Sequence, residues 1–118
     1  MTNNPKVKGN FEDTLFIEGS FEDVLIKVRD LVHAGYELIN HPLGASIRML
    51  FSPYRSIIIS KETKNINSLH VETIENSIAN YKKHMEVRNP DIENSEDYAL
   101  IDNELLESAL KEYERFSS

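Results

Sequence analysis

Hydrophobic residues between positions 21 and 32 recur at the spacing of one helical face. Ser20 precedes this stretch, and Asp23 follows Ser20 by three residues. This is the arrangement of a capping box with Asp in place of Glu. Gly35 suits the end of a helix because it can adopt a positive φ. The pattern therefore predicts an amphipathic helix between Ser20 and Gly35. Its apolar stripe consists of Phe21, Val24, Leu25, Val28, Leu31 and Val32.

Two short β-prone segments, residues 15–18 and 36–40, flank this helix. A strand, a helix and a second strand in this order predict a right-handed parallel βαβ unit from Leu15 to Asn40. Residues 56–60 contain three consecutive isoleucines, which are typical of a strand covered on both faces within a parallel sheet.

Three further segments have helical patterns. From Ser68, apolar residues alternate at spacings of three and four, which predicts a narrow seam that packs on another helix or on a sheet edge. A last helix is expected to begin near Ser95, with Asp102 placed to cap it again and bend it. Asn4 and Pro5 favour a short helix toward Asn10, as N-cap and first helical residue. The seam consists of Val71, Ile74, Ile78, Tyr81 and Met85.

These elements together predict a single α/β domain over residues 1–118. We expect a small three-layer sandwich. It would have a short, mostly parallel sheet, helices on both faces and two consecutive C-terminal helices.

Composition narrows the possible functions. The chain has no cysteine, which excludes a disulfide scaffold, a thiolate nucleophile, an iron–sulfur cluster and any zinc site with sulfur ligands. A net charge of −7 and a pI near 5.0 argue against nucleic-acid binding. We expect neither a metal nor a cofactor, because the helical histidines lack a second ligand one turn away. No membrane span or signal peptide is recognisable, so we expect a cytoplasmic protein.

The connection formed by residues 41–55 is the best candidate for a site. It is long, and the 24 residues between Glu37 and Glu62 include no carboxylate although the chain is acidic. The neutral explanation is that buried strands exclude carboxylates. The functional one is a small-anion site at the carboxyl ends of the strands, with Arg55 as its main charge. Its candidate residues are Asn3, Asn4, His41, Gly44, Ser46, Tyr54, Arg55 and Ser56.

An ordered set of segments resembles the GrdX family of small proteins, encoded beside the glycine, sarcosine and betaine reductases of anaerobic amino-acid fermenters. The resemblance covers nearly the whole chain and implies a genomic setting rather than a reaction. Family members usually have a short strand before the Asn-Asn-Pro segment, for which Met1 leaves no room. We therefore expect a late start codon or a lost first strand. The central loop 46–51 is also more apolar than the family pattern. The segments that carry the resemblance are Thr2–Val7, His41–Ser46, Pro53–Ser56, Ile74–Ile78 and Leu100–Asp102.

Three classes of function remain open. The leading hypothesis is an accessory protein of this reductase metabolism that binds a small anion, with a subunit of the reductase complex as a possible partner. The second is an enzyme acting on a small anionic metabolite, with His41 as acid or base. The third is an interaction module that uses the apolar loop Met49–Phe51 or the acidic helices. We also expect a homo-oligomer, formed through the seam that follows Ser68 and the Met49–Phe51 cluster.

Overall fold

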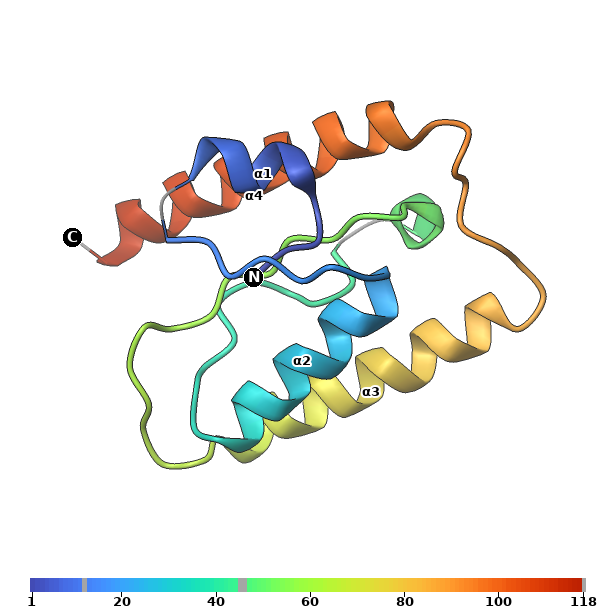
Figure 1. Ribbon diagram of the computed structural model, residues 1–118. Helices are drawn as coiled ribbons and strands as arrows, with labels where there is room; N and C mark the ends of the chain where they lie inside the picture. The colour runs from blue at the N-terminus through green and yellow to red at the C-terminus, as the bar shows by residue number, and fades with distance from the viewer. Residues whose placement is uncertain (12, 45–46, 118) are drawn as a thin grey trace.

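The computed structural model describes residues 1–11, 13–44 and 47–117. Within these residues the chain forms four α-helices and one short 3₁₀ helix, joined by extended segments (Figure 1). The helices are α1 (Pro5–Asn10), α2 (Phe21–His33), η1 (Ile47–Phe51), α3 (Ser68–Met85) and α4 (Ser95–Ser117).

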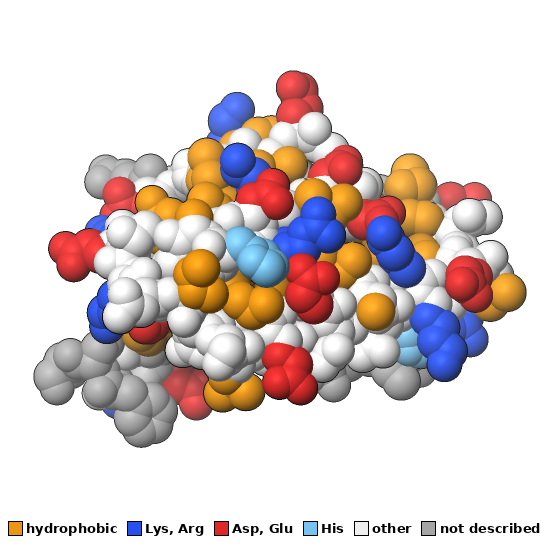
Figure 2. Space-filling model, turned by 90° about the horizontal axis from the view of Figure 1, so that it is seen from below, with side chains coloured by type: hydrophobic (Ala, Val, Ile, Leu, Met, Phe, Trp, Pro, Cys, Tyr) orange, Lys and Arg blue, Asp and Glu red, His pale blue; other side chains and the backbone are white. Residues whose placement is uncertain are grey.

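The helices lie on two sides of the extended segments. In Figure 1, α1 lies beside α4 on one side and α2 packs on α3 on the other. The outer surface of α2 and α3 carries acidic and basic side chains intermixed (Figure 2). Some of them form ion pairs across the two helices, such as Glu22 with Lys82 and Arg29 with Glu75.

The predicted sheet does not form. Within the described residues, the β-pairing between extended segments consists of three isolated bridges, with no continuous ladder. Thr2 is paired in parallel with Phe16 and antiparallel with Ser56, and Leu38 is paired antiparallel with Ile59. The three-layer α/β sandwich with a mostly parallel sheet is therefore wrong. The βαβ unit from Leu15 to Asn40 is wrong as well, because its two outer segments bridge to other parts of the chain.

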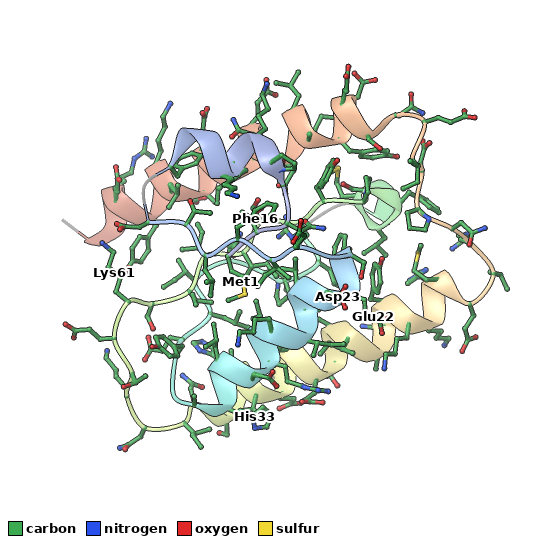
Figure 3. All side chains as sticks on the ribbon, viewed as in Figure 1. Met1, Phe16, Glu22, Asp23, His33 and Lys61 are labelled. Carbon is green, nitrogen blue, oxygen red and sulfur yellow. The ribbon has the colours of Figure 1, made fainter. Side chains whose placement is uncertain are left out.

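Side chains take up several backbone N–H groups that a neighbouring strand would otherwise use, so the bridges do not grow into a sheet. The amide of Ser56 donates to Asp102 Oδ1 at 2.9 Å, and that of Ile58 donates to Asn40 Oδ1 at 2.7 Å. In the segment that follows α2, the amide of Leu38 donates to the ring Nδ1 of His70 at 3.2 Å. Met1 lies in the middle of this layer (Figure 3), where its carbonyl accepts from the amide of Ile57 at 2.8 Å.

The predicted helices are confirmed. At the start of α2, Ser20 Oγ accepts from the amide of Asp23, and the Asp23 carboxylate accepts from the amide of Ser20. After α2, Gly35 has a φ of +106°. Asn4 caps α1, with Pro5 at its first position. The last helix is continuous from Ser95 to Ser117, and the expected second cap at Asp102 is wrong.

The apolar core lies between α2, α3 and the extended segments. The seam of α3 packs here, and the Phe21 and Tyr81 rings stack with their centroids 4.6 Å apart. No helix within the described ranges has the length and hydrophobicity needed to cross a membrane. The buried core consists of Phe21, Val24, Leu25, Val28, Val32, Leu50, Ile57, Ile74, Ile78 and Tyr81.

Candidate functional site

Asp102 of α4 is at the centre of a buried polar cluster that joins three parts of the chain. Its side chain is fully buried. Oδ1 accepts from the amide of Ser56 at 2.9 Å. Oδ2 accepts from Ser56 Oγ at 2.5 Å and from Asn4 Nδ2 at 3.0 Å. We call Thr2, Asn4, Ser56 and Asp102 the Asp102 cluster.

The hydroxyl groups of this cluster have fixed directions. Because Ser56 Oγ donates to the Asp102 carboxylate, the 2.7 Å contact between Thr2 Oγ1 and Ser56 Oγ has Thr2 as the donor. Thr2 Oγ1 in turn accepts from the amide of Asn4 at 2.9 Å. The Asn4 side chain also donates to the carbonyl of Ala99 and caps α1 through its oxygen. The cluster therefore fastens the N-terminal segment and the Ser56 segment to α4.

The side chain of Asn3 holds the backbone that leads into Arg55. Its Nδ2 donates to the carbonyls of Gly19 at 3.0 Å and Pro53 at 2.8 Å, and its Oδ1 accepts from the amide of Arg55 at 2.8 Å. Every donor and acceptor of the Asn3 amide is thereby engaged within the protein. Asn3 is a positioning residue in this arrangement, and the side chain that it positions is Arg55.

Arg55 is 4% exposed, and its guanidinium faces the loop of residues 41–44. Nε donates to the carbonyl of Pro42 at 2.7 Å, and one terminal nitrogen, Nη2, donates to the carbonyl of His41 at 2.5 Å. Burial lowers the pKa of the guanidinium, and the charge of Asp102 partly offsets this effect. Within the described parts of the chain, no carboxylate oxygen lies close enough to an Arg55 nitrogen, at 4.0 Å or less, to form an ion pair.

The loop that Arg55 contacts is a tight turn. The amide of Gly44 donates to the carbonyl of His41 at 3.2 Å, and Gly44 has a φ of +73°. A Cβ atom at Gly44 would lie 3.5 Å from Nη1 of Arg55. A residue with a side chain would therefore be strained by its backbone, and its Cβ would lie in van der Waals contact with the guanidinium.

His41 lies at the rim of this loop with an exposed side chain. Its Nδ1 accepts from the amide of Leu43 at 3.1 Å. Among the residues that the structure describes, this is the one hydrogen bond of its ring. In the part of the chain that the structure describes, no carboxylate forms a hydrogen bond or ion pair with this ring. The described residues also contain no group of three or more His, Asp or Glu side chains that could hold a metal ion.

The predicted site residues fall into two groups. His41, Gly44 and Arg55 come together at the loop. Asn3, Asn4 and Ser56 lie buried behind Arg55, with side chains bonded inside the protein. Tyr54 is half-buried, and its backbone amide and carbonyl both contact Ser52 Oγ. Ser46 lies outside the described residues.

Sequence reasoning missed Asp102 as a site residue. A signal was present, because Asp102 lies four residues after Tyr98 and three before Leu105, beside the apolar stripe of α4. An acidic residue in that position is buried only when it finds partners. Those partners, Asn4 and Ser56, are distant in the sequence.

The surfaces named for self-association are used inside the chain. Ile74, Ile78 and Tyr81 of the α3 seam are buried in the core with α2, and Met49 and Leu50 of η1 are buried as well. Self-association itself stays a prediction, and it would need another surface.

A family model described as GrdX-like protein matches residues 1–111 of the chain. Comparisons with curated proteins and with solved structures gave no match.

Proposed function

Since the chain belongs to the GrdX-like protein family, we propose that it is an accessory protein of glycine, sarcosine or betaine reductase metabolism that binds a small anion at Arg55. The family match over residues 1–111 supports the metabolic setting. Gene order tests this part of the proposal. Reductase genes beside the gene for this chain are the expected result, and a neighbourhood without them would contradict the setting.

The observation that carries the anion site is the buried guanidinium of Arg55. A buried charge is normally balanced by an opposite charge in direct contact. In the described chain Arg55 has two backbone carbonyls instead, and the charge of Asp102 acts on it without a direct contact. Carbonyl dipoles orient the guanidinium but leave its charge unneutralised. A small anion at this position would supply the missing charge.

The ligand class follows from the guanidinium donor that the described residues leave unused. Nε and Nη2 are used by the carbonyls of Pro42 and His41, and the described residues supply no hydrogen-bond acceptor to Nη1. Nη1 is also the nitrogen nearest to Gly44, where the absence of a side chain leaves space. We propose a carboxylate or phosphate group that contacts Nη1 beside Gly44. Glycine, acetate and inorganic phosphate are the probes that distinguish an amino acid, a simple carboxylate and a phosphate.

The test is thermal melting of the full chain with each probe at about 10 mM and chloride at matched ionic strength as the control. The unmodified protein should melt at a higher temperature with at least one probe. Arg55→Gln should lose that shift, whereas Arg29→Gln should keep it because Arg29 is an exposed arginine of α2. A shift retained in Arg55→Gln, or no shift with any probe in the unmodified protein, would overturn the anion site.

A second variant covers the case in which Arg55→Gln fails to fold. Gly44→Ala keeps the arginine but places a Cβ 3.5 Å from Nη1. This variant should melt lower because of the positive φ and should also lose most of the probe-induced shift. His41→Ala should keep the shift, because the contact of His41 with the guanidinium runs through its backbone carbonyl.

A further inference from the structure

One side of α4 carries an apolar stripe that the fold leaves partly uncovered. Its residues lie three or four positions apart. The side chains of Ile101, Leu105 and Tyr113 are 41%, 45% and 45% exposed. The stripe consists of Tyr98, Ile101, Leu105, Ala109 and Tyr113.

Two open hollows follow each other along this stripe. The first, of about 450 Å³, lies against Met49 and the Tyr98 to Leu105 part of α4, and Asp91, Asn94 and Asp97 form its polar edge. The second, of about 390 Å³, begins one turn later at Ala109 and is also lined by Ile39, Ile58 and Tyr113. From Tyr98 to Tyr113 the stripe is about 22 Å long, at about 1.5 Å per residue. This length matches an amphipathic helix of about four turns.

The charge around these hollows is strongly one-sided. Residues 1–90 contain eleven acidic and eleven basic residues, whereas residues 91–118 contain nine acidic and two basic ones. The net charge of −7 therefore belongs entirely to the segment that forms α4 and its approach. Asp91 and Asp97 line the first hollow and Glu112 lines the second. Among the described residues, neither Asp91 nor Asp97 has a basic partner within 4.0 Å.

We propose that this stripe is a docking surface for an amphipathic helix of a partner protein whose apolar face is flanked by lysine and arginine. The apolar residues of the partner would fill the two hollows, and its basic residues would meet the acidic edges. A second copy of this chain fits poorly at the same place, because it would bring two segments of charge −7 together and the rest of the chain has no net positive charge to offer. The surface lies along α4 and does not depend on the anion site at Arg55.

The proposal is tested with a labelled synthetic peptide of about 18 residues, with leucine at helical spacing and lysine elsewhere. Its binding to the full chain is measured by fluorescence anisotropy. A peptide of the same composition in scrambled order keeps the charge but lacks the apolar face. A third peptide with glutamate in place of lysine keeps the apolar face but reverses the charge. Binding of the first peptide at least about tenfold tighter than either control is expected.

Variants locate the binding on the protein. The double variant Ile101→Ser with Leu105→Ser should weaken binding by at least about tenfold. The double variant Asp91→Asn with Asp97→Asn should weaken it by several-fold and reduce its dependence on salt. Leu69→Ser is the matched control, because Leu69 is an equally apolar, 66% exposed residue on α3, and it should bind as the unmodified protein does.

Two results would overturn the proposal. Equal binding of the ordered and scrambled peptides would show attraction to charge alone. Unchanged binding by the Ile101→Ser, Leu105→Ser variant would place the peptide elsewhere. Sedimentation of the protein without peptide tests the other occupant: a dimer that the same double variant dissociates would assign the stripe to a second copy of the chain.

Discussion

The two helical layers of this protein are attached to its centre by different forces. On one side, α2 and α3 bury apolar side chains from almost every turn, including Val28, Ile74 and the stacked pair Phe21 and Tyr81. On the other side, α4 has 23 residues but Leu106 is its one buried apolar residue within the described side chains.

The α4 side is fastened instead by the Asp102 cluster. Hydrogen bonds to a buried carboxylate are directional, so they fix the position of α4 without covering its apolar stripe. A helix can therefore be held firmly in place and still keep a hydrophobic face for another molecule. On the α2 and α3 side most hydrophobic residues are buried in the core, whereas the apolar stripe of α4 stays partly exposed.

The largest effect is expected on the apolar side. Val28→Asp places an unpaired charge at a fully buried position of α2 and should lower the free energy of unfolding by about 4 kcal/mol. Urea unfolding followed by circular dichroism measures this loss. Lys27→Asp is the neighbouring exposed control and should change stability by less than about 1 kcal/mol. Equal stability of the two variants would mean that α2 does not face the core.

The polar side should respond next most strongly. Asp102→Ala removes the acceptor of three hydrogen bonds and leaves buried donors on Asn4 and Ser56 without partners. The expected loss is about 3 kcal/mol, since each unsatisfied buried donor costs about 1–3 kcal/mol. Glu104→Ala, an exposed acidic residue on the same helix, is the control. A loss below about 1 kcal/mol would show that α4 is held by contacts other than the Asp102 cluster.

Alkaline pH separates the two sides in the unmodified protein. Burial, with a smaller contribution from the charge of Glu22, raises the pKa of Tyr81 from 10.0 to about 12. The unfolded chain therefore loses this proton first, so the free energy of unfolding falls as the pH rises from about 10 to about 12 and is unaffected by Tyr81 below that range. Allowing for solvent screening of the phenol, the expected loss is about 1–2 kcal/mol.

Tyr81→Phe gives the control for that titration. The variant should show a shallower loss of stability over the same pH range, as measured by urea unfolding at each pH. Parallel curves for the two proteins would mean that the Tyr81 phenol is not protected by the core.

The helices were predictable because their signals are local. Ser20 and Asp23 cap α2 from positions three residues apart, and Asn4 and Pro5 start α1 as neighbours. The absence of a sheet was not predictable in the same way. The side chains that accept from the amides of the extended segments can come from remote positions, as Asp102 does for the amide of Ser56. Three consecutive isoleucines indicate a buried extended segment, but they do not reveal what its N–H groups will bind.

The candidate site likewise has one part that local sequence patterns indicate and another that depends on contacts between remote residues. Arg55 and the turn at Gly44 are close in sequence and share the acid-free window, and the structure brings them into contact. Asp102 lies 46 residues from Ser56, and its role depends on a pairing that no local pattern reports. The sequence predicts Asn3 and Asn4 as ligand-binding groups of the small-anion site. The structure engages their side chains in internal hydrogen bonds.

The smallest effect is expected on the stripe of α4, and it decides whether the contrast between the two sides is real. Ile101→Ser and Leu105→Ser should each lower the free energy of unfolding by less than about 1 kcal/mol, because these side chains are 41% and 45% exposed. The same change at Ile78, which is buried against α2, should cost about 3 kcal/mol. Urea unfolding of the three variants gives the comparison. If Ile101→Ser and Leu105→Ser cost as much as Ile78→Ser, the stripe belongs to the protein's own core, because only a face that the fold does not use can be made polar without loss.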